Sequence, residues 1–180
     1  MLARTHVWVA AGGLAAYGAV SGHSLGWAGW LAATIGALLP DVDHAQSTFS
    51  KSAGRGWAPG VRHRSGTHTL LAWVIVSAVA GMALGFRNPL AWAFCWGYLS
   101  HLLADLPSGK VPLLWPVVRR RFGLSLIRTG GPLEFLLRYT VIAVVIFLQA
   151  KSYFPSVAAP ALLALSVVGI RATRQLPKAL

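Results

Sequence analysis

The sequence predicts an all-α, polytopic membrane protein with about six transmembrane or interfacial helices, forming one membrane-embedded domain over residues 1–180. Three observations support this prediction: 56% of the residues are hydrophobic, only 11% are charged, and the mean hydropathy is +0.60. Soluble domains carry about 25% charged residues. The chain is therefore expected in a bilayer, where backbone polar groups must be satisfied within helices or closed barrels.

Six apolar segments divide the chain. They run in order over residues 7–22, 25–40, 69–86, 89–106, 132–150 and 155–170. Several are shorter than the roughly 20 residues of an ideal span, so the first two could tilt or enter the bilayer only partly as a hairpin. Glycine recurs through that hairpin, which permits close helix contact in lipid.

Basic residues are distributed unevenly between the connections. The short links 21–24, 87–88 and 151–154 carry two of the sixteen lysines and arginines. Thirteen others lie in the two terminal segments and in the loops 41–68 and 107–131. Because cytoplasmic loops carry an excess of lysine and arginine, both termini and both long loops are expected on the cytoplasmic side of the membrane.

Composition also excludes several classes. A net charge of +12 could indicate a nucleic-acid partner, but the basic residues lie between apolar runs rather than along one soluble face. They are instead interpreted as topology signals, with Arg119–Arg121 as a contact for anionic lipid. The single cysteine, Cys95, cannot form an intramolecular disulfide or a thiolate cluster. No obligate protein partner is indicated.

The few acidic residues and five of the six histidines gather at the span ends on the predicted cytoplasmic side, whereas His23 lies in an opposite link. Imidazole and carboxylate groups together suit a divalent metal ion. The candidate ligands are His6, Asp41, Asp43, His44, His63, His68, His101 and Asp105.

Spacing supports a shared site. His101 and Asp105 are four residues apart, so a helix presents both on one face. Asp41 and Asp43 alternate about Val42, and an extended segment could aim both inward. The glycine between His63 and His68 permits a turn that brings both rings to one centre. Which residue of each of these last two pairs would bind the metal directly stays open.

Further residues are candidates for catalysis. Asp43 or Glu134 could take a proton from water as a general base, and Arg62 and Arg64 could hold a phosphate group. Each candidate has a simpler interpretation. Polar residues at span ends often cap helices or face the interface, the arginines could be topology signals, and Glu134 could cap a helix or pair with Arg138.

Several motifs carry a resemblance. They are T-H at 5–6, L-L-P-D-V-D-H at 38–44, H-R-S-G-T-H-T at 63–69, G-Y-L-S-H-L-L-A-D at 97–105 and G-K-V-P-L-L-W-P at 109–116. In this order they resemble the YdjM-like family of bacterial inner-membrane, metal-dependent hydrolases, which in some bacteria is associated with the LexA-controlled damage response. The family is distantly similar to the zinc-dependent phospholipase C and P1 nuclease group.

The resemblance implies that His6, Asp41 or Asp43, His63 or His68, and the pair His101 and Asp105 bind zinc. Because no histidine follows His101, one or two ions are expected, with Zn²⁺ or another divalent metal as the cofactor. The expected function is hydrolysis of a phosphoester, in a phospholipid or lipid phosphate, by metal-activated water. The alternative is a non-enzymatic metal carrier or sensor, which would place polar residues near mid-membrane.

Overall fold

The computed structural model describes residues 1–42 and 66–153, and these fold as helices. The helices are α1 (Ala3–Ser21), α2 (Gly26–Leu38), α4 (Leu70–Leu84), α5 (Pro89–Ser108) and α6 (Pro132–Tyr153), with short 3-10 helices η1 (Leu39–Asp41) and η2 (Gly66–His68). The five longer helices coincide with the first five predicted segments, which confirms the all-α class. The sixth predicted segment, 155–170, lies outside the described residues.

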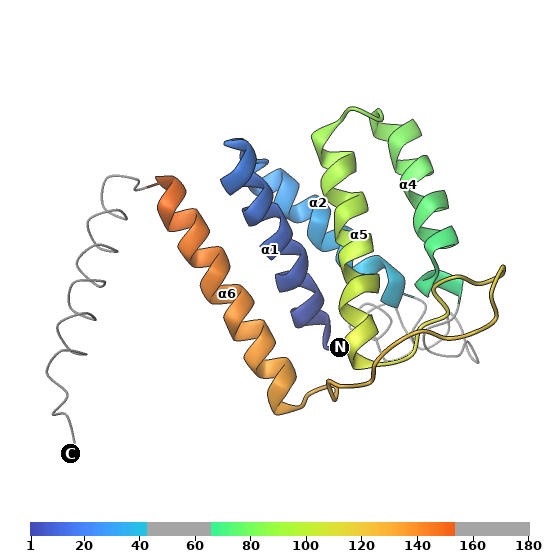
Figure 1. Ribbon diagram of the computed structural model, residues 1–180. Helices are drawn as coiled ribbons and strands as arrows, with labels where there is room; N and C mark the ends of the chain where they lie inside the picture. Colours follow the sequence, from blue (N-terminus) through green and yellow to red (C-terminus); the bar gives the residue numbers. More distant parts are fainter. Residues whose placement is uncertain (43–65, 154–180) are drawn as a thin grey trace, which may run out of the picture.

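Helix α5 is central to the arrangement, because it packs against α1, α2 and α4, while α6 packs against α1 (Figure 1). Figure 1 also shows that the chain reverses direction between successive helices. The N-terminus, the loop 109–131 and the two 3-10 helices lie at one end of the helices, and the links 22–25 and 85–88 lie at the other. The alternation of long, basic connections with short links in the sequence predicted this separation.

Two glycines set the close contact between α2 and α5. An added Cβ on Gly36 would overlap the carbonyl oxygen of Phe94, and one on Gly97 would overlap the carbonyl oxygen of Ala33. The two backbones therefore touch directly, and small side chains around Ala37 fill the remaining space. This contact matters for the site because it brings the end of α2 beside the middle of α5.

One described helix, α6, is long and apolar enough to cross a membrane, over Pro132–Lys151 with a mean hydropathy of 1.8. The expectation of about six spans is therefore not confirmed. Helices α2 and α4 have 13 and 15 residues and reach about 20 and 22 Å, short of the roughly 30 Å hydrocarbon core. Helices α1 and α5 are longer, with 19 and 20 residues, but are not apolar enough over a span's length.

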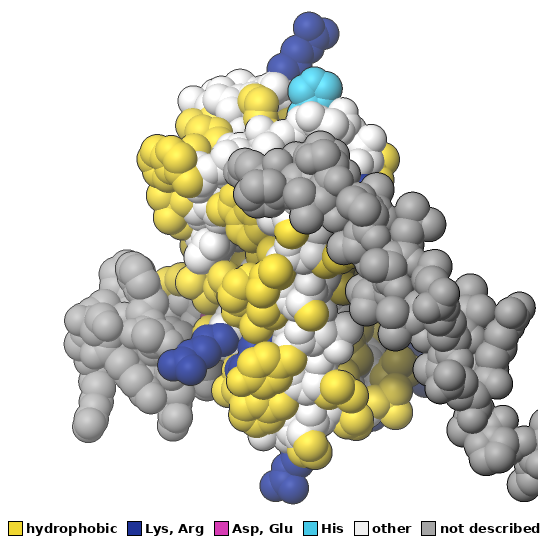
Figure 2. All heavy atoms as spheres, turned by 90° about the vertical axis from the view of Figure 1, so that its left-hand side faces the viewer, with side chains coloured by type: hydrophobic (Ala, Val, Ile, Leu, Met, Phe, Trp, Pro, Cys, Tyr) yellow, Lys and Arg dark blue, Asp and Glu magenta, His cyan; other side chains and the backbone are white. Residues whose placement is uncertain are grey.

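The outer surface nevertheless carries many apolar side chains. Figure 2 shows hydrophobic side chains spread over the flank of the described helices, with basic side chains toward its two ends. Ile75, Val79 and Ile146, in α4 and α6, are each more than half exposed. An apolar flank between basic ends is the pattern of a protein surrounded by lipid.

Candidate metal centre

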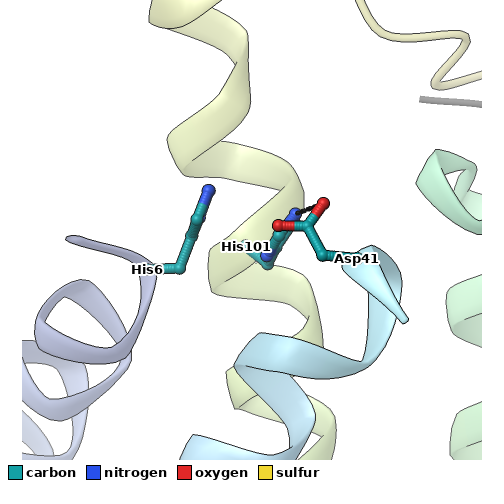
Figure 3. Close-up of side chains that lie close together, drawn as sticks. All are labelled: His6, Asp41 and His101. Carbon is teal, nitrogen blue, oxygen red and sulfur yellow. Dashed lines mark ion pairs between the residues drawn. The ribbon is translucent and has the colours of Figure 1, made fainter. Parts of the chain in front are cut away.

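Five of the predicted ligands converge at the end of the molecule that carries the N-terminus. His6 comes from α1, Asp41 from η1, His68 from η2, and His101 and Asp105 from α5. Figure 3 shows His6 and Asp41 on either side of His101. All except Asp41 are at most 1% exposed. The site is thus assembled from four segments that are far apart in the sequence.

Helix geometry and helix packing orient His101. The spacing of four residues places its Nε2 atom 3.8 Å from Oδ2 of Asp105. Its Nδ1 atom lies 2.7 Å from the carbonyl oxygen of Ala37, on α2. A carbonyl oxygen only accepts hydrogen bonds, so Nδ1 carries the proton and, in the neutral ring, Nε2 presents a lone pair to the site.

His68 is held by the residues around it. The hydroxyl of Tyr98 donates to the Thr67 carbonyl oxygen at 2.6 Å, and Thr67 Oγ1 lies 3.1 Å from Nδ1 of His68. Thr69 accepts from the Ala72 amide and so caps α4 directly after the histidine. As a result His68 Nε2 lies 3.3 Å from His101 Nε2.

The two aspartates surround these rings. Asp41 Oδ1 lies 3.4 Å from His68 Nε2 and 3.7 Å from His101 Nε2. Asp105 Oδ2 lies 3.6 Å from His68 Nε2, while Oδ1 faces His6 at 3.5 Å. Although burial raises the pKa of Asp41, the contact with His68 and the charge of His101 hold it below its ordinary value. Asp41 is therefore a carboxylate at neutral pH.

His6 stacks on His101 with ring centroids 3.7 Å apart and an interplanar angle of 15°. Burial lowers the pKa of His6 well below its ordinary value, and neighbouring His101 lowers it further. Within the described part of the chain, neither ring nitrogen of His6 nor Oδ1 of Asp41 has a hydrogen-bond partner. Buried polar atoms normally form hydrogen bonds, so a neutral imidazole and a carboxylate oxygen that have only ion-pair contacts of 3.4–3.7 Å suit a metal ligand.

The donor atoms are close enough to share an ion. One group comprises His6, Asp41 and His101, the other His68, His101 and Asp105, and within each group the ligand atoms lie within 4.8 Å of one another. Nitrogen and carboxylate oxygen donors of this kind match a zinc-type divalent ion. The residues therefore fit a metal centre.

The cluster has several further contacts that the sequence did not predict. The α-amino group of Met1 lies 2.9 Å from Oδ1 of Asp105, and the Ala37 carbonyl, Thr67 and Tyr98 orient the histidines. Thr67 and Tyr98 do fall within the H-R-S-G-T-H-T and G-Y-L-S-H-L-L-A-D motifs, where they could have been singled out. A backbone carbonyl has no sequence signal, because every residue carries one.

Glu134 lies outside both of these ligand groups. Its Oε1 atom accepts from the Leu2 amide at 2.6 Å and its Oε2 atom from the Gly130 amide at 2.7 Å. The side chain therefore ties the start of α6 to the loop before it and to the N-terminal segment, a capping role that the sequence left open. The guanidinium of Arg138 lies over the rings of Phe135 and Tyr139.

Replacement of Glu134 by glutamine tests this capping role. Because the amide cannot accept from both main-chain amides, we expect Glu134→Gln to lower the free energy of unfolding by about 1.5–3 kcal/mol, measured by denaturation in detergent. The bound metal of the folded fraction should be unchanged. Lys151→Gln, at the exposed far end of the same helix, is the control. Wild-type stability combined with lost hydrolysis would instead assign Glu134 to proton transfer.

The remaining candidates lie outside the described residues: they are Asp43, His44, Arg62, His63 and Arg64. His23 lies in the link at the opposite end, exposed, with Nδ1 2.7 Å from the Ser21 carbonyl oxygen. The structure thus keeps His23 away from the cluster, as the distribution of histidines in the sequence predicted.

The fold and the site define an all-helical protein with an apolar outer surface and a His/Asp cluster at one helix end. The chain belongs to the YdjM inner membrane protein family, whose family model matches residues 1–175. This membership confirms the family that the motifs indicated and its description as an inner membrane protein. No curated protein and no solved structure matches the chain.

Proposed function

We propose that this protein is a membrane-bound, metal-dependent hydrolase that cleaves a phosphoester in a phospholipid or lipid phosphate. The observation that supports it most directly is the convergence of three histidines and two aspartates in one buried cluster. Within the described residues, the ring nitrogens of His6 and Oδ1 of Asp41 have no hydrogen-bond partner there. Unpaired buried polar groups cost free energy unless something binds them. Buried clusters of titratable groups with shifted pKa values are typical of functional sites.

Each residue of the cluster would have a role that follows from its position. His6, Asp41, His68, His101 and Asp105 would hold one or two Zn²⁺-type ions, which supply Lewis-acid activation of water when bound. The Ala37 carbonyl fixes the His101 ring so that Nε2 faces the centre. Asp43, two residues beyond Asp41, would take the proton from the attacking water as general base. Glu134 is less suited to this, because both of its oxygens accept main-chain hydrogen bonds.

The location of the cluster supports an amphiphilic substrate. The His/Asp cluster lies toward one end of the helices rather than midway along them. If the helices cross the bilayer, this end would lie where lipid headgroups meet water. Arg62 and Arg64 precede η2 in the chain and would hold an anionic phosphate group. The sequence contains no H-E-x-x-H motif, which disfavours a typical zinc protease.

We further propose that the protein crosses the membrane several times with both termini and the site in the cytoplasm. The basic residues of the long loops support this orientation. Shorter helices such as α2 and α4 would then cross a locally thinned bilayer, or enter it only partly.

The test is hydrolysis by the purified, zinc-loaded protein of a panel of bacterial phospholipids and polyprenyl phosphates, followed as the release of a phosphorylated headgroup from a phosphodiester or of phosphate from a lipid phosphate. We expect turnover of at least one lipid phosphate that stops when a chelator removes the metal. The same preparation in proteoliposomes should not transport Zn²⁺. Metal transport without hydrolysis of any lipid in the panel would contradict the hydrolase and assign the cluster to a carrier.

A further inference from the structure

The loop between α5 and α6 is an ordered hairpin. Val111 and Phe122 exchange two main-chain hydrogen bonds of 2.8 Å across it, and Val111 is completely buried. At Gly123 the backbone runs so close to Gly109 that an added Cβ would overlap the Gly109 carbonyl oxygen. The outer part of the loop is therefore held in a defined position rather than hanging freely from the helices.

Main-chain bonds also fasten this hairpin to the segments that carry the metal ligands. The Leu124 amide donates to Leu106, directly after Asp105, and the Leu126 amide donates to Pro107. On the other side, the Leu113 carbonyl accepts from the amide of Leu70, two residues beyond His68. The position of the hairpin is thus coupled to the position of the cluster.

The hairpin exposes two kinds of side chain together. Val117 is 90% exposed and Leu124 70%, while the Trp115 ring is about half exposed. The adjoining Arg119–Arg121 are exposed, and no carboxylate contacts them in the part of the chain that the structure describes. The sequence from 107 to 131 contains five basic residues and no acidic one.

This combination suits one environment. Exposed apolar side chains are unfavourable in water, and three adjacent guanidinium groups are unfavourable in the hydrocarbon core. At the headgroup level of an anionic membrane both are satisfied, because Trp and aliphatic groups insert while arginines contact phosphate. The hairpin lies at the same end as the N-terminus and the cluster, where α5 ends and α6 begins.

We propose that residues 110–126 form an interfacial anchor that binds the surface of anionic phospholipids and holds the metal centre at headgroup level. This role does not require that the protein hydrolyses lipid. Each basic residue near an anionic membrane surface contributes about 1 kcal/mol of binding free energy. Three arginines would therefore favour anionic over zwitterionic lipid by up to roughly 100-fold.

A fluorophore on Val117→Cys tests the anchor, in the full chain with Cys95→Ser so that the label has one site. The protein is reconstituted in membranes of phosphatidylcholine mixed with phosphatidylglycerol, and quenching by brominated versions of each lipid gives their relative affinity at the label. We expect stronger quenching by phosphatidylglycerol. Arg119→Gln, Arg120→Gln and Arg121→Gln together should remove that preference, while Arg87→Gln, at the opposite end, should not.

Equal quenching by the two lipids in the labelled chain that keeps all three arginines would overturn the proposal, as would a preference that survives the triple substitution. A label that no lipid quenches, and whose emission shifts when a DNA duplex is added, would assign the surface to nucleic acid instead. Circular dichroism of the triple variant establishes that its helices are intact.

Discussion

Combined substitution of His101→Ala and Asp105→Ala is expected to abolish metal binding. The two side chains lie one helical turn apart on α5, and one or both belong to each group of donor atoms. Loss of residues that merely orient metal ligands already weakens binding by 10–100-fold, so loss of two donors should cost more than about 100-fold. The measurement is metal content of the purified protein, followed by titration with zinc.

His23→Ala is the matched control, because it removes an imidazole at the opposite end of the helices and should leave the metal content unchanged. Both α5 side chains are buried, so their replacement by alanine leaves a cavity. His101→Gln removes the imidazole but keeps a side chain of similar size in contact with its neighbours. Folding of each variant is followed by thermal denaturation. Unchanged zinc content in a folded double variant would show that the cluster is not the metal centre.

Asp43→Asn is expected to lower phosphate release by about 100- to 10,000-fold, the usual contribution of a general base. The substitution removes the proton acceptor but keeps the shape of the side chain. Metal content should therefore fall much less than in Asp105→Ala, where a buried donor is lost. The measurement pairs turnover of the lipid phosphate identified by the release assay with metal analysis of the same preparation.

The outcome separates two roles for Asp43. If Asp43→Asn loses its metal together with its activity, Asp43 is a ligand and the base must be sought elsewhere. If activity persists, Asp43 has no part in proton transfer. Asp41→Asn serves as the comparison, because Asp41 contacts both His68 and His101 and its substitution should weaken metal binding.

Much of the fold follows from local features of the sequence. The apolar runs predicted the positions of α1, α2, α4, α5 and α6 to within a few residues, because a helix is specified by its own residues. Their ability to span a membrane did not follow in the same way. Whether α2 and α4 can span a membrane depends on their length. The sequence pattern predicts the ends of a helix only to within one or two residues, and that difference is enough to change the result.

In the site, too, local features were predictable from the sequence and contacts between distant segments were not. The spacing of His101 and Asp105 predicted a shared helix face, because 3.6 residues per turn fixes that geometry locally. Glu134 illustrates the opposite case. Its position near a span end was compatible with a base, a ligand or a cap, and only the placement of Leu2 and Gly130 around its oxygens favours the cap.

The sequence by itself determined the all-α class, the family, and the gathering of His6, His68, His101 and Asp105 at one end of the helices. Only the tertiary structure decided which atoms face one another there. The direct contact of α2 with α5 at Gly36 and Gly97 brings the Ala37 carbonyl to His101 and thereby turns Nε2 toward the other donors. Local periodicity specifies the face of each helix, whereas contacts between helices depend on the packing of the whole bundle.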